Sequence, residues 1–282
     1  MKYILKPLLL FAFISSFAQE SVLKFDKKIY GCENNWITYP LKEKDTTYML
    51  GYVYIDRSAG LTYHFENRFK ISNEGKFIPL KKNNTSRIIA RIQNLNTICA
   101  IIPSDKFKDL EIIETPEFMK SYVNSNEADD LVERAFQYNH IGASFLAVPL
   151  LEKAQNINHL AKNLLFELGY AYNATEQFEK CITLLHIGIS KYEKNNWLLY
   201  KELIFALCHN NQLENAEVAF KNGMKIKEKS YIDETAFNIA QGYFNKKDKK
   251  KFEEWKNIAK EYSTKIDSPV MKNLELMTND LK

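Results

Sequence analysis

The feature that most constrains this chain is an internal repeat in its C-terminal half. One small or apolar residue marks each unit: Ala135, Gly169, Ile204 and Ala240. The steps between these four residues are 34, 35 and 36 residues. Three positions after each marker stand Tyr138, Tyr172, Leu207 and Tyr243. Nineteen positions after each marker stand Ala154, Gly188, Gly223 and Ala259. A repeat of this length predicts a solenoid, in which each unit buries its apolar face against its neighbours.

Large apolar residues stand between the small ones, at Leu131, Leu165 and Tyr200 before the marker and at Leu151, Leu185 and Phe220 after it. This pattern resembles the tetratricopeptide repeat (TPR), a pair of antiparallel helices of about 34 residues. The resemblance covers residues 127–264 and implies an all-α solenoid of about four helix pairs. Two departures stand out. The Pro that usually ends each unit is absent, and Pro149 lies early in the second helix of the first unit, where it could kink or restart that helix.

Residues 19–120 follow a two-residue period instead. Leu61 to Lys70 alternates apolar and polar residues, with Thr62, His64 and Glu66 on the polar side, which predicts a strand with one wet face. Residues 48–55 are apolar on both faces, which predicts a strand inside the sheet. The chain has only 9 Gly and 7 Pro, which predicts few special backbone positions.

These patterns together predict an α+β chain. An antiparallel β-rich domain over residues 19–120 ends in a short helix that begins at Thr115-Pro116-Glu117. The TPR-like solenoid follows over residues 127–264. A charged capping helix over residues 267–282 shields the last apolar face from water.

The first residues predict export. Lys2 and Lys6 precede an apolar run of about ten residues, and Ser16 and Ala18 supply the small residues of a cleavage site. We therefore expect residues 1–18 to be a signal peptide, although a retained anchor is the alternative. No later segment is apolar enough to span a membrane. The mature chain is expected in the periplasm or at the cell surface.

The TPR resemblance implies a concave groove lined by the first helix of each unit. The position after the small marker holds Phe136, Tyr170 and Phe205, three aromatic residues that could bind an extended peptide or a helix. Further along the same helices lie Asn139, Asn173 and His209, and the two Asn could hydrogen-bond a ligand backbone. The alternative is that the aromatic rings pack against neighbouring helices or the N-terminal domain. We expect a non-catalytic adaptor with a protein or peptide partner.

Motifs for other functions are missing from the sequence. It contains no phosphate-binding glycine loop, no zinc-protease motif and no nucleophile-elbow motif. His64 and Glu66 would supply two metal ligands where a zinc site needs three or four. We therefore expect no catalytic residues, no cofactor and no metal. A net charge of +4 gives no reason to expect a nucleic-acid partner. The basic run at residues 246–251 is either a solvated turn or a contact with an anionic surface.

Two further questions remain open from the sequence. If Trp36 and Tyr39 are exposed, they could stack on sugar rings, and the alternative function is therefore a glycan-binding module of the cell envelope. The four cysteines, Cys32, Cys99, Cys181 and Cys208, allow three pairings. A Cys32–Cys99 disulfide and buried free thiols are both compatible with export.

Overall fold

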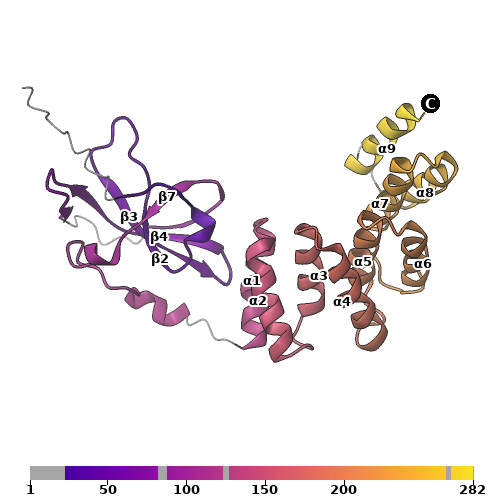
Figure 1. Ribbon diagram of the computed structural model, residues 1–282, viewed down its shortest axis with the longest axis horizontal. Coiled ribbons are helices and arrows are strands. Elements are labelled where there is room, and N and C mark those ends of the chain that lie inside the picture. The colour runs from indigo at the N-terminus through magenta and orange to yellow at the C-terminus, as the bar shows by residue number, and fades with distance from the viewer. Residues whose placement is uncertain (1–22, 82–87, 123–126, 265–267, 282) are drawn as a thin grey trace, which may run out of the picture.

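The chain has an antiparallel sheet followed by a helical solenoid, as Figure 1 shows. The computed structural model describes residues 23–81, 88–122, 127–264 and 268–281. The predicted signal peptide lies outside these residues. The α+β class, with a TPR-like arrangement of helix pairs, is confirmed. Among the described residues, no helix has the length and apolar character needed to cross a membrane.

In the N-terminal part, the described residues form one sheet of seven antiparallel strands. The strands are β1 (Lys27–Lys28), β2 (Asn35–Thr38), β3 (Tyr48–Asp56), β4 (Gly60–Ile71), β5 (Phe77–Pro79), β6 (Ile88–Arg91) and β7 (Ile98–Ile101). Their order is β1-β7-β2-β3-β4-β5, and β6 pairs with the first half of β4. Three short 3-10 helices, Ile29–Gly31, Ser104–Lys106 and Glu117–Tyr122, flank the strands. The predicted helix after Thr115 is thus a 3-10 helix.

The face that holds the first half of β4 is covered, which corrects the expectation of a wet face there, whereas Arg68 and Lys70 in the second half are exposed as predicted. Thr62 and His64 are buried, and the ring of His64 stacks on Phe118 with centroids 4.2 Å apart. Phe118 belongs to the segment 104–122, which packs on this face with Trp36, Tyr52 and other core residues. Polar residues in a strand indicate a wet face only where nothing distant in sequence covers them.

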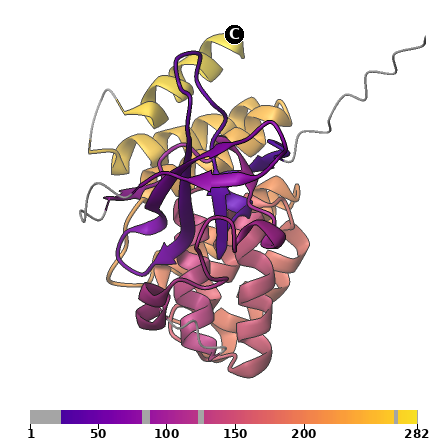
Figure 2. The same cartoon turned by 90° about the vertical axis from the view of Figure 1, so that its left-hand side faces the viewer.

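The opposite face of the sheet joins the core of the solenoid. Ile37, Val53, Ile55, Leu61 and Tyr63 belong to one apolar cluster with the helices that follow. Figure 2 shows the sheet in front of those helices. Residues 48–55 are apolar on both faces because β3 has an apolar layer on each side, as the sequence predicted for a strand inside the sheet.

Over residues 127–264 and 268–281, the chain forms four antiparallel helix pairs and a final helix. The pairs are α1 (Ala128–His140) with α2 (Ser144–Ile157), α3 (Leu164–Ala174) with α4 (Phe178–Lys191), α5 (Trp197–His209) with α6 (Leu213–Gly223), and α7 (Ile232–Asn245) with α8 (Lys249–Tyr262). The final helix, α9 (Pro269–Asp280), is capped by the side chain of Ser268. Helix α2 runs unbroken through Pro149.

The small residues of the repeat mark the places where helices approach most closely. A Cβ atom on Gly188 would lie 2.9 Å from Leu165, and one on Gly223 would lie 2.7 Å from Trp197. Any larger side chain would force the neighbouring helix outwards. The regular spacing of the small residues in the sequence therefore reflects the packing of neighbouring helices.

The turn inside each pair contains a left-handed residue, and these residues repeat like the small ones. They are Gly142, Glu176, Asn211 and Lys247, with φ between 58° and 76°. The left-handed conformation ends a helix and lets the chain reverse. Only one of the four is Gly, so the low Gly content did not mean few special backbone positions. Lys247 places the basic run at the turn of the fourth pair.

A tyrosine–glutamate hydrogen bond joins a first helix to the pair before it. Tyr172 in α3 donates to Glu152 in α2 at 2.9 Å, and Tyr243 in α7 donates to Glu217 in α6 at 2.6 Å. Helix α1 has no preceding pair, and here the sheet supplies the acceptor. Tyr138 in α1 donates to Glu33, which precedes β2. The β domain thus takes the place of a preceding repeat.

Other polar contacts strengthen the junction between sheet and solenoid. Arg134 places Nη2 at 3.1 Å from both carboxylate oxygens of Glu33. Gln137 donates to the backbone oxygen of Arg57 at 2.8 Å, and the guanidinium of Arg57 lies 3.1 Å from the carboxylate of Asp130. The junction therefore fixes the sheet against α1, at the end of the solenoid opposite α9.

Candidate partner-binding surface

The first helices of the pairs form the inner row of the solenoid. Helix α1 contacts α3, α3 contacts α5, and α5 contacts α7. The second helices leave hollows between neighbours, one of which holds about 650 Å³ between α2 and α4. A two-layer array curves towards its more closely spaced layer. The inner row is the more closely spaced layer of the two.

The three predicted aromatic residues lie on this inner row. Phe136 in α1 and Tyr170 in α3 are 45% and 38% exposed, and Phe205 in α5 is half-buried. A buried position would have indicated a purely structural role, because large aromatic side chains are rarely left in water without a reason. The exposed rings repeat from one first helix to the next.

Further rings extend this stripe, and the sequence did not single them out. Phe136 stacks on His140 at 5.9 Å between centroids, and Phe166 lies 6.5 Å from Tyr170. Phe166 occupies the position four residues before Tyr170, so the 3.6-residue period of a helix could have identified it. We define the aromatic stripe as Phe136, His140, Phe166, Tyr170, Phe178, Phe205 and His209.

His209 lies at the end of the stripe and is exposed. Its ring is 4.2 Å from that of Phe205 and 5.2 Å from that of Phe178. Partial burial against these rings lowers the pKa of His209, and the charge of Glu176 partly offsets this effect. A neutral imidazole stacked on two phenyl rings extends the apolar surface.

The two predicted asparagines have a different role from the one expected. Asn139 donates from Nδ2 to the backbone oxygen and the carboxylate of Glu167, at 3.1 and 2.8 Å. Asn173 repeats this arrangement on Glu202, with both distances 2.9 Å. Both amides are buried, so they join neighbouring first helices and do not face a ligand. The third unit has Cys208 at the equivalent position, where no amide can continue the series.

Burial also affects the carboxyl group of Glu167, the acceptor of Asn139. The pKa of Glu167 is raised because burial disfavours its charged form, although the hydrogen bond from Asn139 partly offsets this. The Asn–Glu series thus lies at the base of the inner row, beneath the aromatic stripe. It orients the helices that carry the rings.

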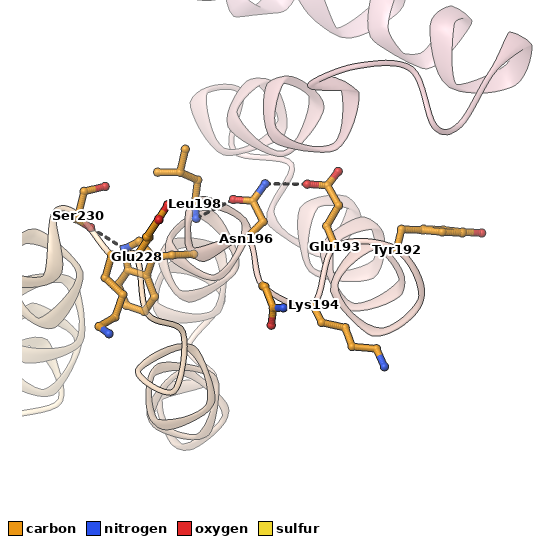
Figure 3. Close-up of a pocket in the computed structure, with 10 residues that line it drawn as sticks. Tyr192, Glu193, Lys194, Asn196, Leu198, Glu228 and Ser230 are labelled. Atoms are coloured by element: carbon orange, nitrogen blue, oxygen red, sulfur yellow. Dashed lines mark hydrogen bonds between the residues drawn. The ribbon is translucent and has the colours of Figure 1, made fainter.

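An open polar hollow lies at one edge of the solenoid, as Figure 3 shows. It holds about 740 Å³ between the α4–α5 turn and the connection from α6 to α7. Asn196 accepts from the backbone N–H of Leu198 at 3.1 Å and donates to Glu193 at 2.6 Å. These contacts cap α5, so the polar groups already have structural partners. None of the predicted site residues lines this hollow.

The alternative function, a glycan-binding module, required Trp36 and Tyr39 to be exposed, and Trp36 is not. This residue is only 3% exposed, and its indole nitrogen donates to the backbone oxygen of Ile113 at 2.7 Å. Tyr39 is half-buried and packs on Tyr63 with centroids 5.3 Å apart. Trp36 belongs to the core of the sheet and offers no face to a sugar ring.

The described part of the chain has no cluster of side chains suited to a metal ion. No group of three or more His, Cys, Asp or Glu side chains there could hold a metal ion. His64, which was considered with Glu66 as a possible metal ligand, is buried beneath Phe118.

Comparison with known proteins gives only a distant structural likeness. No protein-family model matches the chain, and no curated protein matches it. A solved structure titled MamA MSR-1 superposes with a TM-score of 0.40 at 15% identity, over 58% of this chain and 85% of that one. A second, titled MamA AMB-1, gives a TM-score of 0.42 at 18% identity, over 51% and 79%. Likenesses of this degree carry no argument about function.

Proposed function

We propose that this chain is an exported, non-catalytic adaptor that binds a protein or peptide partner along the aromatic stripe. The observation that carries the proposal is the repetition of exposed rings on successive first helices, above all Phe136 and Tyr170. A helix or an extended segment laid along the inner row would cover rings from several units at once. Aromatic side chains dominate the binding energy of many such surfaces.

The rigidity of the inner row supports this proposal. Asn139 fixes α1 to α3, and Asn173 fixes α3 to α5, through buried hydrogen bonds. The rings are therefore held before a partner arrives, which lowers the entropy lost on binding. Fully burying one large apolar side chain contributes about 1.5–3 kcal/mol. Covering the exposed parts of several rings would contribute a part of this free energy for each ring, against the cost of association.

Export is supported by the sequence of residues 1–18, in which a basic start precedes an apolar run and small residues. A periplasmic or surface location would place the partner in the cell envelope. Five of the seven members of the stripe are Phe or Tyr, and burial lowers the pKa of His209 towards the neutral form, which favours an apolar segment of the partner.

The decisive experiment compares capture by the mature chain and by the triple variant Phe136→Ala, Tyr170→Ala and Phe205→Ala. Each protein is immobilised and exposed to envelope extract, and bound proteins are identified by mass spectrometry. We expect the parent to retain one stoichiometric protein and the triple variant to lose it, with unchanged far-UV circular dichroism. Purified partner then gives the affinity of each variant directly.

The matched control removes exposed apolar residues of the outer row, with Ile157→Ala, Leu160→Ala and Ile187→Ala. These side chains are about as exposed as those of the stripe but lie on the second helices or the loop after them. The control should keep the partner. Equal loss in both triple variants would contradict a groove-specific role, and unfolding of the stripe variant would show that its rings are core.

A further inference from the structure

Two cysteine side chains meet in the core of the sheet. Cys32 and Cys99, in β7, are both fully buried, and their sulfur atoms lie 3.4 Å apart. The structure contains both as free thiols. The backbone already holds the pair in place, because Lys27 in β1 pairs with Cys99 and Ile29 donates to the backbone oxygen of Thr97 at 3.0 Å.

This arrangement suits a covalent bond. A disulfide has its sulfur atoms about 2.05 Å apart, so the observed contact must close by about 1.4 Å. Closing this gap requires rotation of the two side chains towards each other. Cys181 is placed differently, since its sulfur contacts the backbone oxygen of Gly169 at 3.4 Å inside the solenoid.

We propose that Cys32 and Cys99 form a disulfide bond that ties the segment before β2 to β7. The oxidant is an exchangeable disulfide, carried by a thiol–disulfide oxidoreductase or by oxidised glutathione. One cysteine thiolate attacks a sulfur of this carrier, and the carrier releases its first thiol. The second cysteine thiolate then attacks the sulfur of the first cysteine, and the carrier's other sulfur leaves as a thiolate. Both cysteines lose their protons, and the carrier receives two electrons and leaves as two thiols.

In the folded chain, the contact between the two sulfurs lowers the pKa of Cys32 and, together with burial, raises the pKa of Cys99. Because both sulfurs are fully buried in the folded chain, exchange with the carrier takes place before the core closes.

The bond would act at the junction between sheet and solenoid. Cys32 directly precedes Glu33, whose carboxylate accepts hydrogen bonds from Arg134 and Tyr138 in α1. Fixing Cys32 to β7 fixes the backbone from which Glu33 reaches the solenoid. The bond closes a loop between positions 67 residues apart, and long loops give large stabilisation in the chain-entropy account.

The test uses the full mature chain, reduced and unfolded, then refolded in a mixture of reduced and oxidised glutathione. We expect the intact mass to fall by two hydrogen atoms, and proteolytic mapping to give one peptide pair joined through Cys32 and Cys99. The oxidised protein should unfold at a midpoint roughly 10 °C above that of the same protein after reduction. The control variant Cys181→Ser, Cys208→Ser should behave identically.

Two results would overturn the proposal. One is quantitative alkylation of both Cys32 and Cys99 when the refolded protein is unfolded without reductant. The other is a disulfide that maps to any different pair. The variant Cys32→Ser, Cys99→Ser should lose both the mass change and the difference in midpoint, and if it fails to fold, the mass of the parent protein still decides. Partner capture plays no part here, so this test stands apart from that of the aromatic stripe.

Discussion

Replacing Glu33 by Ala removes the carboxylate on which two side chains of α1 converge. Arg134 and Glu33 are only 19% and 12% exposed, and the guanidinium lies 3.1 Å from both carboxylate oxygens. At this distance the Coulomb energy is about 5 kcal/mol for an effective dielectric constant near 20. Desolvation of the two charges offsets much of that energy.

The hydrogen bond from Tyr138 adds to the effect. A hydrogen bond to a charged acceptor contributes about 1.5–3 kcal/mol, and Tyr138 is buried, so its hydroxyl would be left without this acceptor. We expect Glu33→Ala to lower the free energy of unfolding by about 3 kcal/mol. Tyr138→Phe alone should lower it by about 1.5 kcal/mol.

The assay is urea unfolding followed by far-UV circular dichroism, applied as a double-mutant cycle of Glu33→Ala with Tyr138→Phe. We expect a coupling energy of about 1 kcal/mol or more, since the two groups share one hydrogen bond. The control is Glu74→Ala, on an exposed turn of the same domain, with an effect within about 0.5 kcal/mol. An effect of Glu33→Ala no larger than the control, or strict additivity in the cycle, would refute the view that the β domain replaces a preceding repeat.

Two other predictions follow from the packing and the buried charges. Gly51→Ala should destabilise the sheet by more than about 2 kcal/mol, because the new Cβ would stand 2.2 Å from the ring of Tyr63; an unchanged thermal midpoint would disprove this. Burial alone would raise the pKa of Glu217, but hydrogen bonds from Lys251 and other donors hold it below its ordinary value. Its contribution to stability is therefore present above the unfolded pKa and is lost as the pH falls through the folded one. Glu167, with a raised pKa, has the opposite sign, and its contribution is lost as the pH rises through the folded pKa. The free energy of unfolding, measured from pH 3 to pH 7, tests both signs. Glu217→Gln should lose less stability than the parent as the pH falls, and Glu167→Gln should lose less stability than the parent as the pH rises. Curves parallel to that of the parent would contradict both predictions.

Much of the solenoid could be predicted because its contacts are local. Each helix pair packs mainly on the next pair, so the residues that must be small recur at a nearly constant spacing. Gly188 and Gly223 illustrate this, since both face a large side chain of the helix beside them. The exposed positions of Phe136 and Tyr170 followed from the same register.

The candidate site was predicted only in part. The amides of Asn139 and Asn173 could not be assigned from one repeat, because their acceptors lie 28 and 29 residues further along the chain. A search for Asn and Glu at a shared offset between units would have found them. The left-handed turn residues were missed for a different reason, since Glu176 and Lys247 occupy a conformation that composition associates with Gly.

By itself, the sequence determined the repeat, the order of sheet and solenoid, and the row of aromatic side chains, because these depend on periodicity within segments of a few dozen residues. Only the tertiary structure decided what covers the sheet, where Trp36 lies, and which acceptor serves Tyr138. Those outcomes depend on segments far apart in the chain that bury each other's surfaces. Burial of that kind leaves no period in the sequence, since each partner meets its counterpart only after the chain has folded.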